Sequence, residues 1–296
     1  MLGALCALAG GARANEVAST ENAAVPESST PAPSTPAMTA PPERHWRLGI
    51  AAGYGRRTNP LIQSEDIPVA VDVDIAWFGR RWFFDNGDLG VTLIDRDRFT
   101  TSLVARVNSD RAFFSKTNTK YVTFLQSAGG AQPPALDFTG TPIPAPEPLK
   151  PPRRDYAIEA GFETLIDGAW GAATLRAFHD VSNTHDGYEI SASYDYRITR
   201  GRLSIAPSLG IAYKDDALSD YYWGVHEDEA SFVLQQYFAR GGLSWEVGLR
   251  GSYYLSEHLR IAASANYERL EYSVARSPLV KDPYVVGYFA GLAWTF

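Results

Sequence analysis

From Trp46 to the C-terminus, apolar and polar residues alternate in short segments, a period that is typical of β-strands and fits no helix. The stretch 187–198 shows the pattern clearly. One face carries Tyr188, Ile190, Ala192, Tyr194, Tyr196 and Ile198, and the other carries Glu189, Ser191, Ser193, Asp195 and Arg197. The segments have about the 9 to 11 residues that a tilted strand needs to cross a bilayer. The pattern therefore predicts an all-β chain with one apolar and one polar face.

Threading these segments up and down gives an even number of strands with both termini at the same end, as in a transmembrane antiparallel β-barrel. We expect about twelve strands, with ten as the alternative. The expected strands are 46–54, 67–78, 80–85, 88–94, 97–109, 155–166, 169–180, 187–199, 201–214, 241–255, 257–270 and 284–296. The weak points are the short arms around the Asn86-Gly87 turn and Pro207 inside a strand.

Alternation alone also describes a soluble β-sandwich, so the choice depends on the connections and the aromatic residues. Connections at one end are short, whereas those at the other end are mostly long, above all near 110–154 and 215–240. The aromatic residues divide between the two ends in the same way, as interfacial girdles do. The short-turn end carries Trp46, Trp77, Trp170 and Trp294, and the other end carries Tyr54, Tyr156, Tyr188, Tyr213, Tyr267 and Tyr284. Both features favour the membrane barrel.

Three segments lie outside this pattern. Residues 1–14 are rich in Leu, Ala and Gly and end in Ala12-Arg13-Ala14, which predicts a cleaved secretory signal peptide. Residues 15–45 are rich in Pro, Ser and Thr and cannot bury enough apolar surface to fold, so we expect a disordered periplasmic tail. A second Pro-rich stretch, near 128–152, is expected in an extracellular loop at about 110–154. The barrel would then occupy residues 46–296.

The charge balance excludes one large class of partner. The chain has 27 Lys and Arg against 34 Asp and Glu, so its net charge of -7 argues against nucleic-acid binding. Its one cysteine, Cys6, lies in the expected signal peptide, which removes disulfides and thiolate metal sites from consideration. We expect no cofactor and no resident metal.

Inward-facing positions of the expected strands carry a balanced set of charges. The arginines are Arg47, Arg98, Arg106, Arg176, Arg197, Arg202, Arg250 and Arg260. The carboxylates are Asp72, Asp74, Glu159, Glu163, Glu189, Asp195, Glu246 and Glu268. An unpaired charge in a confined lumen is costly, so the balance predicts a network of internal ion pairs rather than a filter of one sign.

Two polar clusters in the expected loops contain groups that could serve catalysis or bind a divalent ion. The first is His179-Asp180 with Ser182, His185 and Asp186, and the second is His226-Glu227-Asp228-Glu229. Catalysis needs a nucleophile and an oriented base within hydrogen-bond reach, which adjacency in sequence does not establish. Solvated polar loops explain both clusters equally well, so the chain is predicted not to be an enzyme.

The last residues alternate up to a terminal aromatic side chain. Tyr288, Leu292, Trp294 and Phe296 share one face, and this ending resembles the signal by which the barrel-assembly machinery recognises outer-membrane proteins. The stretch from Trp46 onward is similar to the MipA/OmpV family of MltA-interacting outer-membrane proteins. The similarity is carried by residues 82–84, 89–90, 184–187, 207–210, 220–225, 255–259 and 277–280.

This resemblance implies a barrel without known catalytic residues in the outer membrane of a Gram-negative cell. It also implies a scaffold that joins a lytic transglycosylase to a penicillin-binding murein synthase. The alternative is a small-solute porin or a surface adhesin that acts through its extracellular loops. Outer-membrane lipid and the barrel-assembly machinery are further expected partners. The Pro-rich stretch near 128–152 and the long N-terminal tail depart from the family pattern and put any function carried there in doubt.

Overall fold

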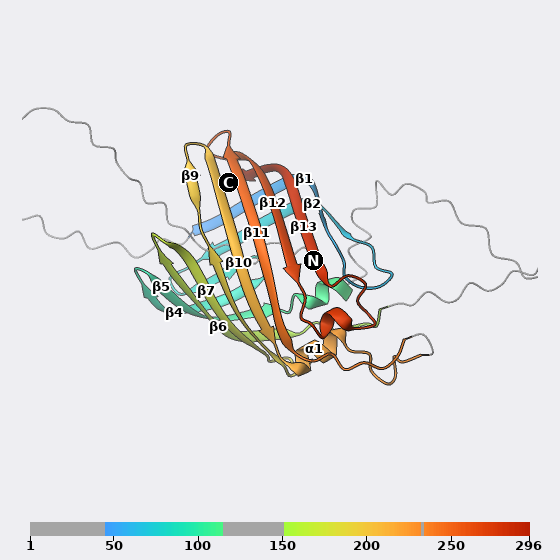
Figure 1. The fold of residues 1–296 in the computed structure, drawn as a ribbon. Coiled ribbons are helices and arrows are strands. Elements are labelled where there is room, and N and C mark those ends of the chain that lie inside the picture. The colour runs from blue at the N-terminus through green and yellow to red at the C-terminus, as the bar shows by residue number, and fades with distance from the viewer. Residues whose placement is uncertain (1–44, 115–150, 232–233) are drawn as a thin grey trace, which may run out of the picture.

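The computed structural model describes residues 45–114, 151–231 and 234–296, which form a closed antiparallel β-barrel (Figure 1). The strands follow one another in chain order around the barrel, and the first strand pairs with the last. Thirteen strand segments are present, but β8 and β9 both pair with β10 and form one interrupted strand. The barrel therefore has twelve strands, which confirms the larger of the two expected numbers.

The observed bounds agree closely with the expected ones. The strands are β1 (His45–Arg57), β2 (Ile67–Phe78), β3 (Trp82–Asp85), β4 (Asp88–Arg96), β5 (Phe99–Val107), β6 (Ile158–Gly168), β7 (Gly171–Asp180), β8 (Tyr188–Asp195), β9 (Ile198–Arg200), β10 (Leu203–Lys214), β11 (Gly242–Tyr254), β12 (Leu259–Arg269) and β13 (Tyr284–Thr295). Within the described ranges, three short helices lie between strands: η1 (Asp110–Phe114), α1 (Asp216–Trp223) and η3 (Val274–Arg276). No helix among the described residues is long and apolar enough to span a membrane.

Pro207 explains the interruption between β8 and β9. Its carbonyl accepts a hydrogen bond from the backbone N–H of Tyr196, so its nitrogen also faces that neighbouring strand. Proline has no N–H to donate, and the ladder is lost for Tyr196 and Arg197 before it resumes at Ile198. The proline thus breaks the neighbouring strand, while β10 itself continues through it.

Aromatic side chains ring the two ends of the barrel. At the end with short turns, which we call the turn end, the rings of Trp46 and Trp77 lie 6.3 Å apart. At the opposite end, the loop end, tyrosines of neighbouring strands pair in the same way. These pairs are Tyr54 with Tyr288, Tyr188 with Tyr213, and Tyr267 with Tyr284. Trp245 lies 5.5 Å from Tyr267 and is a tryptophan among the tyrosines, so the division by residue type is not complete.

Apolar side chains from several loops pack into a cluster at the loop end, near α1 at the bottom of Figure 1. We call this cluster the loop-end cap; its buried members are Leu61, Phe113, Phe114, Leu218, Tyr222, Trp223, Val225, Leu234, Ala239, Leu270, Val274, Leu279 and Val285. Asp215 begins α1 by accepting a hydrogen bond from the Leu218 N–H at 3.0 Å. The helix thereby places Tyr222 and Trp223 on its buried side.

Several expectations fall outside the described residues. The signal peptide at 1–14, nearly all of the tail at 15–45 and most of the Pro-rich stretch near 128–152 belong to this group. They stay predictions. The loop expected at 110–154 is described only at its two ends.

Candidate functional site

Arginine side chains link adjacent and next-but-one strands inside the barrel. The Arg47 guanidinium contacts Asp74 on β2 and Asp85 on β3, each at 3.0 Å. Arg176 on β7 contacts Glu163 on β6 at 2.6 Å. Further pairs join Arg250 to Asp195 and Arg57 to Glu268. The forked guanidinium suits such bridges because it can serve two acceptors at once.

Other residues expected in the lumen occupy two kinds of position. Asp72, Glu246 and Arg260 are half-buried on inward positions, and Arg260 donates a hydrogen bond to Thr295 at 3.1 Å. Arg98, Arg197 and Arg202 are instead exposed at the turn end, in two turns and in the break before β9. The alternation had been extended through these positions, although the strand register ends before them.

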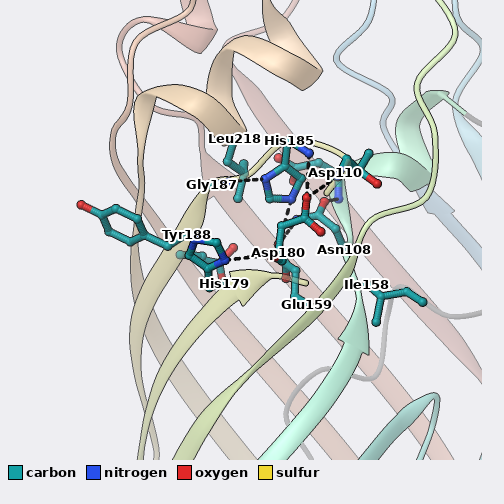
Figure 2. Close-up of polar contacts among 12 residues, drawn as sticks. Asn108, Asp110, Ile158, Glu159, His179, Asp180, His185, Gly187, Tyr188 and Leu218 are labelled. Carbon is teal, nitrogen blue, oxygen red and sulfur yellow. Dashed lines mark hydrogen bonds and ion pairs between the residues drawn. The ribbon is translucent and has the colours of Figure 1, made fainter. Parts of the chain in front are cut away.

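Near the loop end of the lumen, five polar residues form a buried group that we call the mouth network. Its members are Arg106, Asn108, Glu159, His185 and Glu189. Figure 2 shows three of them, Asn108, Glu159 and His185. The Arg106 Nε donates to Glu159 at 2.8 Å, and its Nη2 donates to Glu189 at 2.9 Å. The Asn108 amide donates to Glu159 at 2.6 Å. The Glu159 side chain is fully buried, so these bonds replace the water that burial removed.

His185 completes the mouth network from the loop between β7 and β8. Its Nδ1 accepts a hydrogen bond from the Gly187 N–H at 3.0 Å, which places the proton of the neutral ring on Nε2. Nε2 lies 3.5 Å from Glu159 Oε1, and the side chain is fully buried. The ring also packs 5.8 Å from the ring of Tyr222. These contacts make His185 a structural link between the lumen and the loop-end cap.

A second buried group, the Lys214 cluster, consists of Asp110, Lys214, Trp223 and Glu271. The Lys214 ammonium lies 2.8 Å from both carboxylate oxygens of Asp110 and 3.8 Å from Glu271. The Trp223 indole N–H donates to Asp110 at 3.1 Å. Burial raises the pKa of Glu271 to about 7, and the Lys214 charge offsets only part of this effect.

The first predicted loop cluster is held together by Asp180. One carboxylate oxygen accepts the backbone N–H groups of Thr184, His185 and Asp186 at 2.6, 2.7 and 3.0 Å. The other accepts both the N–H and the hydroxyl of Ser182. Within the described part of the chain, no histidine contacts this hydroxyl. Asp180 therefore shapes the loop.

The second predicted loop cluster is anchored by an ion pair. Arg154 is buried and binds Glu229, and it also donates to the Gly224 carbonyl at 2.9 Å. Burial acts to raise the pKa of Glu229, but hydrogen bonds from Arg154 and from the backbone of His226 hold it below its usual value. Glu227 and Asp228 of the same cluster are exposed.

The fold brings these two clusters together around one open cleft of about 350 Å³. One wall comes from residues 183–186 and the other from Ala217, Asp220, Tyr221 and His226. The imidazole of His226 lies 3.6 Å from Asp220. Among the residues that the structure describes, no three His, Cys, Asp or Glu side chains converge as metal ligands would. The cleft is therefore a polar surface depression between two loops.

The C-terminal aromatic face lies on the outside of the barrel. Tyr288, Leu292, Trp294 and Phe296 are all exposed, and the Phe296 N–H donates to the Leu48 carbonyl at 2.9 Å. This outward row can contact lipid or another protein. Its role as an assembly signal stays a prediction.

Several important residues were not expected. Asp110 and Glu271 follow directly after strands, where alternation no longer indicates direction. Arg154 lies in a segment without strand pattern. Lys214 ends the expected strand 201–214, where it shares a face with Ser204 and Ser208, and this alternation is the sequence signal that it points inward.

Comparison with known proteins gives relatives from one class. YiaT of Escherichia coli (strain K12), named as an outer membrane protein, is 31% identical over 145 residues, which are 49% of this chain and 59% of YiaT. Outer membrane protein OmpV of Vibrio cholerae is 29% identical over 128 residues, 43% of this chain and 50% of OmpV. The MltA-interacting protein of E. coli (strain K12) is 26% identical over 144 residues, 48% of this chain and 58% of that protein. The chain thus spans only about half to three fifths of these relatives.

Among solved structures, a loop-deletion mutant of the Vibrio cholerae outer membrane protein OmpT covers 86% of this chain and 99% of its own length, with a TM-score of 0.33 and 6% identity. A porin covers 86% of this chain and all of its own, with a TM-score of 0.29 and 11% identity. A family model described as MltA-interacting protein MipA matches residues 48–296. This match covers most of the chain, which therefore belongs to the MipA family and is an outer-membrane protein.

Proposed function

We propose that this protein is a non-enzymatic scaffold of the outer membrane that binds murein-remodelling enzymes at its turn end. The observation that carries the proposal is the state of the lumen, which is cross-linked by arginine–carboxylate pairs and covered by the loop-end cap. With its lumen cross-linked and capped in this way, the barrel offers its two rims for contacts with other proteins.

The turn end has a charge that suits protein contacts. Seven exposed arginines lie in its turns and adjoining strand ends: Arg80, Arg81, Arg96, Arg98, Arg197, Arg200 and Arg202. Four exposed carboxylates lie there as well: Asp95, Asp97, Asp167 and Glu257. The rim thus has a positive excess, which would steer and orient an acidic partner surface. In the proposed orientation this rim faces the periplasm, where the murein layer lies.

The family relationship supports the choice of partner. The E. coli relative carries in its name an interaction with MltA. We infer that the partner of this chain is a lytic transglycosylase, with a penicillin-binding synthase as the second enzyme on the same scaffold. The N-terminal tail, which leaves the barrel from the turn end, would add to this contact.

One observation favours a second function. The open cleft at the loop end is polar and faces away from the turn end, so it could bind a small solute or a surface ligand. In this alternative the protein would be an adhesin or a small-solute channel that acts through its loops.

Capture by an immobilised lytic transglycosylase tests the scaffold directly. We expect the purified full chain to be retained, and we expect at least tenfold weaker retention when Arg98, Arg197 and Arg202 are all replaced by Gln. Replacement of three exposed loop-end charges, Glu227, Asp228 and Lys281, provides the matched control and should leave retention unchanged. Planar-bilayer recording should show no steady conductance. Absence of capture, together with steady conductance, would favour the channel instead.

A further inference from the structure

A basic cleft of about 540 Å³ opens at the loop end, between the start of β11 and the loop that follows β12. We call it the arginine cleft. Its larger lining side chains are Tyr237, Arg240, Leu243, Tyr272 and Arg276. The described residues that line it thus include two arginines and no carboxylate. The arginine cleft shares no lining residue with the polar cleft between the two loop clusters, so it is a separate feature of the loop end.

Hydrogen bonds hold the two walls of the arginine cleft together. The Tyr237 hydroxyl donates to the Ser273 carbonyl at 2.7 Å, and the Arg240 N–H donates to the Ser273 hydroxyl at 2.7 Å. The Gly241 N–H donates to Asp216 at 2.8 Å, which ties the same wall to α1. The two arginines therefore project from an anchored backbone.

The guanidinium groups of the cleft can receive an anion. Arg276 donates to the Tyr272 hydroxyl at 2.5 Å and lies 5.3 Å from the centre of its ring, which uses one of the five N–H donors of the guanidinium. Within the described part of the chain, no carboxylate lies within ion-pair distance of Arg240 or Arg276. Arg56, another exposed arginine at the loop end, is instead neutralised by Asp66 at 2.5 Å. The arginine cleft thus carries positive charge that its own lining does not offset.

A third arginine lies on the outer wall of the barrel near the cleft. Arg269 is the last residue of β12 and pairs with Trp245 of β11. Because side chains alternate along a strand, Arg269 shares the outward face with Tyr267, and Leu243 is the next outward residue of β11 after Trp245. Arg269 therefore extends the positive charge from the cleft onto the wall that faces the bilayer.

The arginine cleft borders the loop-end girdle, which marks the depth of the lipid headgroups. Leu243 pairs with Tyr213, and the rings of Trp245 and Tyr267 lie 5.5 Å apart on the adjoining strands. Leu243 and Tyr272 are 66% and 75% exposed, so the cleft also presents apolar surface. A ligand at this depth meets guanidinium groups and apolar side chains together, as an anionic lipid does.

We propose that the arginine cleft binds the phosphate group of a lipid headgroup in the leaflet that surrounds the loop end. Arg240 and Arg276 contact the phosphate oxygens, since the guanidinium fork matches phosphate geometry. Arg269 adds to the attraction from the wall, and Leu243 contacts the apolar part of the lipid. Free phosphate has the same anionic group but no apolar part. This site lies at the opposite end of the barrel from the murein-enzyme contact and does not depend on it.

Native mass spectrometry of the full chain, released from detergent micelles, tests the site with a defined probe. The probe is phosphorylated lipid A, and the control is the same lipid without its phosphates. We expect the phosphorylated lipid to bind at least about tenfold more tightly, because only its phosphates can pair with the arginines. Inorganic phosphate in large excess should not displace the lipid.

The double variant Arg240→Gln with Arg276→Gln removes the charge of the arginine cleft and should weaken lipid binding at least about tenfold. Arg80→Gln with Arg81→Gln removes the same charge from exposed positions at the turn end and is the matched control, with binding within about twofold of the parent. If the cleft variant does not fold, the comparison of the two lipids still decides.

Three results would overturn the proposal. The first is equal binding of the two lipids, and the second is a cleft variant that binds lipid as well as the control variant does. The third is displacement of the lipid by inorganic phosphate, which would assign the cleft to a free anion. Capture by a lytic transglycosylase is measured separately, so its failure would leave these results unchanged.

Discussion

Replacement of Lys214 by Met tests the ionic structure under the loop-end cap. Lys214 lies 2.8 Å from both oxygens of Asp110 and 3.8 Å from Glu271, and all three side chains are at least nine-tenths buried. The variant leaves two buried carboxylates near each other without their cation. Removing one partner of a buried pair typically costs about 3–5 kcal/mol. Glu271 already titrates near neutrality and can take up a proton. We therefore expect a loss at the lower end of this range, about 3 kcal/mol.

The measurement is the free energy of unfolding in urea, with the full chain in detergent micelles, together with amide exchange in α1. Exchange should accelerate in α1, because Trp223 donates to the same carboxylate. Lys281→Met is the matched control, since Lys281 is exposed, and it should change stability by less than about 1 kcal/mol. The double variant Lys214→Met with Asp110→Asn should recover part of the lost stability, because it also removes the buried negative charge of Asp110. A Lys214→Met protein as stable as its parent would refute the assignment of this pair.

Three further outcomes can be measured by urea unfolding. Because burial raises the pKa of Glu271 from 4.5 to about 7, the folded state holds this proton more tightly than the unfolded state. The contribution of Glu271 to stability should be largest below pH 4.5 and fall by up to about 3 kcal/mol as the pH rises through 7, so the difference in unfolding free energy between the parent and Glu271→Gln should change with pH in this way. Trp223→Ala should lower the free energy of unfolding by about 3–5 kcal/mol, because the Trp223 side chain is buried in the loop-end cap. Tyr272→Ala, at an exposed loop position, should lower it by less than about 1 kcal/mol, and equal losses would contradict the packing of the cap. Gly87→Ala should cost about 1 kcal/mol because of its positive φ. Gly251→Ala should cost less, because an added Cβ there would lie at an ordinary contact distance of 4.0 Å from the Ala263 carbonyl oxygen, and the reverse order would contradict the turn geometry.

The barrel was predictable because lipid and lumen impose opposite chemistry on successive residues. In β10, for example, Leu209 and Ile211 are exposed on the outer face, while Ser208 and Ala212 are half-buried on the inner face. This contrast identified all twelve strands and most of their bounds. It failed at Arg197, because an alternating sequence does not reveal that Pro207 on the adjacent strand cannot donate a hydrogen bond.

The contacts at the loop end could not be predicted in the same way. Lys214 and Asp110 are 104 residues apart, and Asp110 lies in a helix that no alternation reaches. His185 and His226 were both noted as chemically interesting, but their place around one cleft depends on how two loops fold over the barrel. Residue type therefore identified the reactive side chains, whereas the pairing of those side chains required the three-dimensional structure.

The short hairpin connects what the sequence predicted with what the structure adds. The arms around Asn86-Gly87 looked too short for a barrel strand, and β3 indeed has only four residues beside a neighbour of twelve. Among the described residues, β3 pairs with three of the twelve residues of β2. The short arms that made the strand count uncertain thus correspond to a real irregularity in the barrel wall.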